Sequence, residues 1–167
     1  VNPAPHQAGR AGPENEAGDM FDVIITFAKH SGWPYEVVEA GSAVRVPLQG
    51  DHGEWLAVIM ADEALNQCMV FSYLTGEVPA ALRPPMAEFL TRANYGLRIG
   101  NFEMDFEDGE VRYRTSLDMA GEGLSPAMLK QLVTHNATQF DNYLPGIQAV
   151  LGGTPPVEAI DTVEAAG

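Results

Sequence analysis

The polar residues with the best spacing for chemistry lie between Phe102 and Arg114. Glu103 and Asp105 are two residues apart, and so are Arg112 and Arg114. In extended strands this spacing places each pair on one face. Two neighbouring carboxylates can divide acid and base roles when their surroundings separate their pKa values, but facing arginines hold both ionised. The cluster therefore predicts a structural ladder of ion pairs, with an uncharacterised enzyme site around it as the alternative.

Other reactive residue types do not form known catalytic or metal-binding patterns. The histidines His6, His30, His52 and His135 lack the three- or four-residue spacing of a helical metal pair. Cys68 is the only cysteine and stands in an apolar run, which predicts a buried thiol. No nucleophile elbow, P-loop or dinucleotide-binding glycine pattern occurs. We therefore expect no catalytic residue, no metal and no cofactor.

The chain is strongly acidic, with 23 acidic residues against 9 basic ones and a formal net charge of −14 at pH 7. This charge repels phosphate backbones and anionic lipid headgroups, so nucleic acid and membranes are not expected partners. The longest apolar runs, such as 55–61, are too short to span a bilayer. Together with the lone cysteine, these features predict a soluble cytoplasmic protein.

Hydrophobic spacing divides the chain into the elements of an α+β domain. Helical spacing occurs in 19–31, in 84–96 and from 125 onward, with Asp19 and Ser125 as expected N-caps. Strand patterns occur at 35–39, 44–48, 55–61, 67–74, 102–106 and 111–114. The order α-β-β-β-β-α-β-β-α predicts an antiparallel or mixed sheet with three main helices. Strands 55–61 and 67–74 are apolar on both sides, so we expect both faces to be covered.

Both ends are expected to lie outside this single domain, which spans residues 19–153. Residues 1–18 are rich in Pro, Gly, Ala and polar residues, which predicts a disordered tail. Residues 154–167 begin with Thr154-Pro155-Pro156 and are predicted to be a loose tail. Within the last helix, Pro145 should cause a kink or an interruption, and Asn136-Ala137-Thr138 matches a glycosylation sequon that its helical place makes accidental.

The strand pair at 102–114 contains Asp108-Gly109, which favours a two-residue type I′ turn. The resulting register pairs Asp105 with Arg112, and Glu103 with Arg114. The apolar residues of the first strand then share the buried face: Phe102, Met104 and Phe106.

The strand at 44–48 carries Pro47, which is typical of a sheet edge because proline offers no N–H to a neighbouring strand. An exposed edge can accept a strand from another chain. We therefore take Val44, Val46 and Leu48 as the candidate partner-binding edge.

The stretch from Phe89 to Met119 resembles the YbjN-type family of bacterial proteins. The residues that carry the resemblance are Ala93-Asn94 at the end of the second helix, Gly100 with Phe102 opening a strand, and the return from Gly109 to Arg114. The resemblance extends over residues 19–153. It implies a fold like that of the type III secretion chaperones, which are small acidic dimers that hold an extended segment of a client protein. Members of the family are described as sensory-transduction regulators, and the resemblance carries no catalytic residue to this chain.

These observations together favour a non-enzymatic protein-interaction or chaperone-like regulatory module. We expect a homodimer that binds a protein or peptide client through a sheet edge or an apolar helix face. The alternative remains an enzyme whose site lies near Glu103, Asp105, Arg112 and Arg114.

Overall fold

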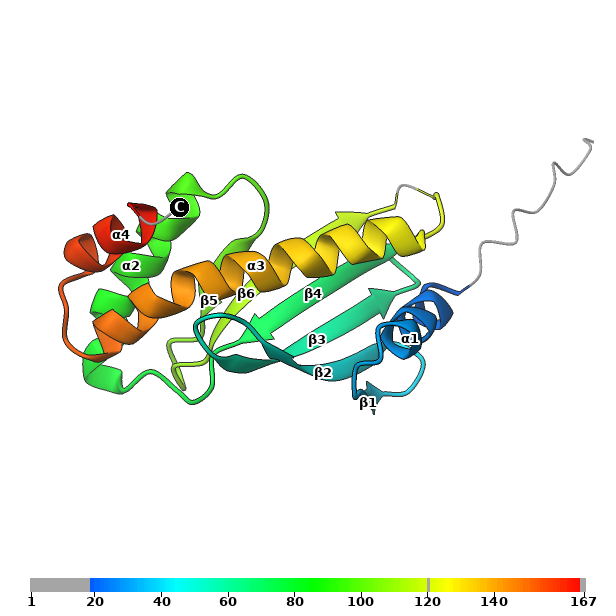
Figure 1. Cartoon of the computed structure of the whole chain (residues 1–167), viewed down its shortest axis with the longest axis horizontal. Coiled ribbons are helices and arrows are strands. Elements are labelled where there is room, and N and C mark those ends of the chain that lie inside the picture. Colours follow the sequence, from blue (N-terminus) through cyan, green and yellow to red (C-terminus); the bar gives the residue numbers. More distant parts are fainter. Residues whose placement is uncertain (1–18, 120, 166–167) are drawn as a thin grey trace, which may run out of the picture.

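The computed structural model describes residues 19–119 and 121–165, so the predicted tail at 1–18 lies outside the described residues. Six strands form one antiparallel sheet in the order β1-β2-β3-β4-β6-β5 (Figure 1). The strands are β1 (Glu36–Glu39), β2 (Ala43–Gln49), β3 (Glu54–Asp62), β4 (Gln67–Tyr73), β5 (Asn101–Met104) and β6 (Val111–Asp118).

The helices are α1 (Met20–His30), the short 3-10 helix η1 (Ala80–Leu82), α2 (Arg83–Gly96), α3 (Pro126–Leu151) and α4 (Pro156–Glu164). Both predicted N-caps are confirmed. The Asp19 carboxylate accepts a hydrogen bond from the Phe21 N–H at 2.9 Å, and the Ser125 hydroxyl accepts one from the Met128 N–H at 3.1 Å. The α+β class and the predicted order of elements are therefore confirmed as far as α3.

The prediction of a loose tail after residue 153 was wrong for the segment that forms α4. Pro156 is a favourable first residue because the first helical N–H groups have no partner within the helix. Ala159 and Ile160 are buried in the cluster that α2 and α3 also supply. Burial against these helices, which local composition does not report, therefore orders the segment.

Of the kink or interruption expected at Pro145, the interruption was wrong, because α3 continues through Pro145 to Leu151. The next residue, Gly146, lets α3 approach α2 closely. A Cβ atom at Gly146 would lie 2.5 Å from the Phe89 ring. The long helix is thus held in place by its packing partners.

The helices lie on one face of the sheet. Figure 1 shows α3 running across the sheet, with α1 towards one end and α2 and α4 grouped at the other. Side chains beneath α1 and α3 are buried, as at Val46, Ile59 and Val70, whereas the opposite side of β3 leaves Leu56 45 % exposed. The expectation that β3 and β4 are covered on both faces was therefore wrong for the described residues.

The register of the β5–β6 hairpin differs by two residues from the predicted one. Met104 lies opposite Val111 and Glu103 opposite Arg112, so the side of the sheet was right and the pairing was wrong. Phe106 lies in the loop and is 58 % exposed instead of buried. A shift of two residues keeps every side chain on its original face because the side-chain period of a strand is two.

Contacts from a distant helix explain the wider loop between β5 and β6. The guanidinium group of Arg83 donates hydrogen bonds to the carbonyl of Phe106 at 2.9 Å and to that of Asp108 at 2.7 Å. Gly109 has a φ of +91°, and a Cβ atom there would lie 2.3 Å from the Val78 carbonyl. The loop is therefore docked against the start of α2, which the local Asp-Gly signal does not reveal.

Candidate functional site

The structure brings together three of the four residues in the predicted polar cluster. Glu103 accepts a hydrogen bond from Nε of Arg112 at 2.7 Å, and its other oxygen lies 3.0 Å from Nε of Arg114. Asp105 does not join them, because its carboxylate accepts a hydrogen bond from the N–H of Glu107 within the loop at 2.7 Å. The two carboxylates therefore do not form a pair.

The surroundings of Glu103 favour its ionised form. Burial alone raises the pKa of Glu103, but the hydrogen bonds from Arg112 and Asn101 and the charges of both arginines outweigh it and hold the pKa below its usual value. A carboxyl group held in this way is a poor proton donor at neutral pH. The cluster is consistent with the predicted structural ladder.

Other chemical groups of the described residues are dispersed. Within 19–119 and 121–165, no three His, Cys, Asp or Glu side chains gather where they could hold a metal ion. Cys68 is buried as predicted, and burial raises the pKa of its thiol to about 12. Among the helices of the described segments, none is both long and apolar enough to cross a membrane.

The predicted partner-binding edge is only partly at an edge. β1 pairs with β2 at residues 43–45, where Val44 lies opposite Val37, so Val44 is not on an open edge. β1 begins only at Glu36, after Pro34, and none of its residues pairs with Val46 or Leu48. We call residues 46–49 the open half of β2.

The backbone groups of the open half can be assigned from the β2–β3 ladder. The Ser42 carbonyl accepts a hydrogen bond from the Ala61 N–H at 2.8 Å, and the Gly50 N–H donates one to the Gly53 carbonyl at 2.9 Å. Because backbone groups alternate in direction along an antiparallel strand, even-numbered residues of β2 face β3 and odd-numbered residues face outward. On the outer side, Pro47 therefore presents only a carbonyl, because proline has no N–H. Gln49 presents both an N–H and a carbonyl on that side.

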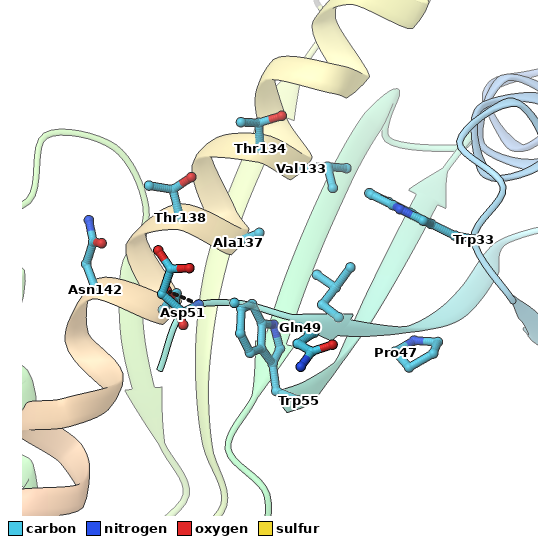
Figure 2. Close-up of a pocket in the computed structure, with 13 residues that line it drawn as sticks. Trp33, Pro47, Gln49, Asp51, Trp55, Val133, Thr134, Ala137, Thr138 and Asn142 are labelled. Carbon is cyan, nitrogen blue, oxygen red and sulfur yellow. Dashed lines mark hydrogen bonds between the residues drawn. The ribbon is translucent and has the colours of Figure 1, made fainter. Parts of the chain in front are cut away.

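A groove of about 600 Å³ lies between the open half of β2 and α3 (Figure 2). Pro47 and Gln49 line it from the strand, and Val133 and Ala137 line it from the helix. Figure 2 shows Trp33 at the end towards α1, with Asp51 and Asn142 at the opposite end. The groove therefore runs beside outward-facing backbone groups that have no strand partner within 19–119 and 121–165.

The acidic end of the groove is held by a carboxylate on α3. Asp141 is 8 % exposed and accepts hydrogen bonds from the N–H groups of Asp51 and His52, both at 3.0 Å. A Cβ atom at position 50 would lie 2.2 Å from an oxygen of Asp141, so Gly50 is needed for this approach. Asp141 thereby ties the β2–β3 turn to α3 and sets the width of the groove at that end.

A buried polar network fixes α3 on the sheet beneath the groove. The indole N–H of Trp55 donates to the Ser72 hydroxyl at 2.8 Å, and that hydroxyl donates to Oδ1 of Asn136 at 2.6 Å. The amide nitrogen of Asn136 donates to the Val70 carbonyl at 3.0 Å. Asn136 is fully buried, so its glycosylation sequon is inaccessible in the folded chain.

Sequence reasoning placed Asn136 on the buried stripe of the last helix but did not find this network. The available signal was a polar residue within an apolar stripe, because such a residue requires hydrogen-bond partners when it is buried.

Comparison with known proteins gives the chain a family. The model of the YbjN family, described as "Putative bacterial sensory transduction regulator", matches residues 21–149. No curated protein sequence matches the chain significantly. The crystal structure of YbjN, "a putative transcription regulator from E. coli", is 16% identical, with a TM-score of 0.54, and the match covers 79% of this chain and 89% of that one.

Two solved complexes are also similar to this chain. They are the ExsC–ExsE complex, with 12% identity and a TM-score of 0.48, and the HopA1–SchA chaperone–effector complex, with 14% identity and a TM-score of 0.43. The matches cover 74% and 72% of this chain, and 89% of the matched chain in each case. Because the family model spans residues 21–149, most of the sequence, the chain belongs to the YbjN family.

Proposed function

We propose that this protein is a non-enzymatic regulatory module that works as a homodimer and holds an extended segment of another polypeptide. The observation that carries the proposal is the open half of β2, residues 46–49, which lies directly beside the groove formed with α3. Backbone groups and a groove in this arrangement suit recognition by strand addition.

The client segment would continue the sheet beyond β1. Its backbone would bond the N–H and carbonyl of Gln49 and the carbonyl of Pro47, which face outward. Every second side chain of the client would then point towards α3, where Val133 and Ala137 line the groove. Apolar residues at alternate positions of the client would gain most from this burial.

The charge of the protein favours a basic client. The whole chain carries a formal net charge of −14, and Asp51 and Asp141 lie at one end of the groove. A field of this sign accelerates encounter with a cationic segment, and added salt screens it. We therefore expect binding to weaken, mainly through slower association, as the salt concentration rises through the physiological range.

The family description supports a regulatory role that is exerted by binding. A regulator can act by contact with another protein without transforming a substrate. The ion pair of Glu103 with Arg112 agrees with such a role, because it holds Glu103 ionised and makes it a poor proton donor. The homodimer follows from the sequence resemblance, and light scattering at micromolar concentration tests it. A monomer would contradict this part of the proposal.

A peptide library tests the binding site directly. Random twelve-residue peptides displayed on phage would be selected on the wild-type protein, on Gln49→Pro and on Gln49→Ala. Proline removes the outward N–H of residue 49, whereas alanine keeps it, so the two variants separate the backbone bond from the side chain. We expect wild type and Gln49→Ala to select peptides with alternating apolar residues and added Lys or Arg.

We expect Gln49→Pro to lose these peptides while its melting temperature stays close to that of the wild type. Equal selection by Gln49→Pro would exclude strand addition at this edge.

A further inference from the structure

The face of the sheet opposite α3 carries a continuous apolar patch. Its six residues come from the two central strands, and we call them the open-face patch: Leu56, Val58, Met60, Met69, Phe71 and Tyr73. The strand register places them side by side, with Leu56 opposite Tyr73 and Val58 opposite Phe71. All the described helices pack on the other face, so none of them covers this patch.

Part of the patch is shielded by its own neighbours. Phe71 is only 7 % exposed, because the Arg112 guanidinium lies 4.8 Å from the centre of its ring and the ring of Tyr73 lies 6.3 Å away. Leu56 remains 45 % exposed. Val58, Met60, Met69 and Tyr73 are half-buried, and apolar residues gathered in this way on a protein surface are typical of a contact with another molecule.

Charged residues surround the open-face patch in a definite pattern. On one flank, β6 supplies Arg112 and Arg114, which share the single carboxylate of Glu103 and leave a net positive charge. Asp62 lies at the end of β3, and Asp118, which accepts a hydrogen bond from the Gln67 amide at 3.4 Å, lies at the same end of β6. The β6 flank of the patch is therefore cationic, and the end at Asp62, at right angles to that flank, is acidic. The opposite flank carries the ion pair of Arg45 with Glu36, and the opposite end carries Glu54.

We infer that the open-face patch binds the same patch of a second copy, with the strands of the two sheets crossing at close to a right angle. The two-fold axis lies in the plane of the interface and runs diagonally to the strands. It therefore sets the β6 flank of each copy against the Asp62 end of the other. It places Arg114 over the partner's Asp62, and the partner's Arg114 over Asp62. The Arg114 and Asp62 side chains of the two copies are thus complementary across this axis, whereas Asp118, at the corner that the axis passes, lies near its own copy. Orthogonal packing is an ordinary arrangement of two sheets.

The size of the face is adequate for a dimer. The face is five strands wide, from β2 to β5 in the sheet order, with strands about 4.8 Å apart. Each central strand contributes about seven residues that rise about 3.3 Å each, so the flat area is on the order of 550 Å². Side-chain relief adds to this area. A stable interface buries about 800 Å² on each partner, which is of the same order.

This inference rests on the homodimer in the proposed function and assigns its surface. Sedimentation velocity across roughly 1 to 100 µM would compare the wild type with Leu56→Glu and Val157→Glu. Val157 lies on α4 and is 45 % exposed, the same fraction as Leu56, so it is a matched control. We expect twice the chain mass of 18.0 kDa for wild type and control, and a dissociation constant at least about tenfold higher for Leu56→Glu.

A charge exchange tests the orthogonal geometry. Arg114→Asp and Asp62→Arg should each raise the dissociation constant of the dimer by about tenfold, and the double variant should return it to within about threefold of wild type. Circular dichroism and melting of each variant confirm that the monomer is folded. A double variant no better than either single variant would overturn the proposed crossing.

The outcomes also separate this surface from the client-binding site. A wild-type dimer that survives Leu56→Glu but is lost in Gln49→Pro would assign the dimer to the β2 edge and overturn the inference, as would a wild-type monomer. If the wild type is a monomer that binds another protein, and only Leu56→Glu loses that protein, the open-face patch would be a binding site for that protein and not a dimer interface. Peptide selection by Leu56→Glu should match that of wild type, because Leu56 lies on β3 and does not line the groove.

Discussion

On the face that α3 covers, the polar side chains of Ser72, Thr115 and Asn136 are buried and bond to one another or to nearby backbone. On the open face, charged side chains adjoin an apolar patch, as Arg112 and Glu103 do beside Phe71, and uncharged polar residues such as Asn101 and Ser116 share that face. The strands β3 and β4 are apolar on both sides, yet only one side is packed within the chain. The polar groups beneath α3 are thus buried and bonded within the chain, whereas those beside the open-face patch remain partly exposed.

The sharpest test of this difference uses two adjacent residues of β3. Ile59 is fully buried beneath the helices, whereas Met60 faces the open side. We expect Ile59→Ala to lower the free energy of unfolding by about 3 kcal/mol, through lost burial and a residual cavity. Met60→Ala should cost less than about 1 kcal/mol in urea unfolding at a concentration that keeps the chain monomeric. Equal losses would show that the open face is packed within a single chain.

The buried network of the covered face should be the next most sensitive feature. Replacing Asn136 by Leu leaves the Ser72 hydroxyl and the Val70 carbonyl without its amide, which should cost about 2 kcal/mol. Asn142→Leu makes the same change at an exposed position of the same helix and should cost little. Thermal unfolding of both variants measures the difference. A small loss at Asn136 would mean that the network contributes little to holding α3 on the sheet.

The ion pairs of the open face should give the smallest effect, and one that depends on pH. Because the pKa of Glu103 is lower in the folded chain than its usual value, its ionised form stabilises the fold above that usual value. This contribution is lost as the pH falls through the lower folded pKa. Glu103→Gln should therefore cost about 1 kcal/mol at neutral pH, since its arginine partners are partly exposed.

In urea unfolding, the difference between wild type and Glu103→Gln should be largest above the usual pKa of glutamate and should shrink as the pH falls through the lower folded pKa. A difference that does not change with pH would show that the charge of Glu103 does not stabilise the open face.

Much of the local structure was predictable because its causes are local. Asp19 and Ser125 cap α1 and α3 because each side chain reaches the N–H groups that follow it in sequence. The period-two pattern of 102–104 and 111–113 correctly assigned each side chain to a face of the sheet. The buried state of Cys68 followed from the apolar run around it.

The features that sequence reasoning missed depend on groups far away along the chain. Arg83 decides the width of the β5–β6 loop from more than twenty residues away, because it bonds three of the loop carbonyls. Burial against α2 and α3 stabilises the helix at 156–164, although Pro156 and the Glu and Ala residues after it were local helix signals that the tail prediction overlooked. The groove exists because β1 covers only half of β2 and because Asp141 holds the next turn from 90 residues away. The amino-acid sequence by itself determined the elements and the side to which their residues point, since backbone preferences and periodicity act over a few residues. Only the tertiary structure decided the registers, the open edge and the uncovered face, since these depend on which distant groups compete for the same backbone bonds and the same apolar surface.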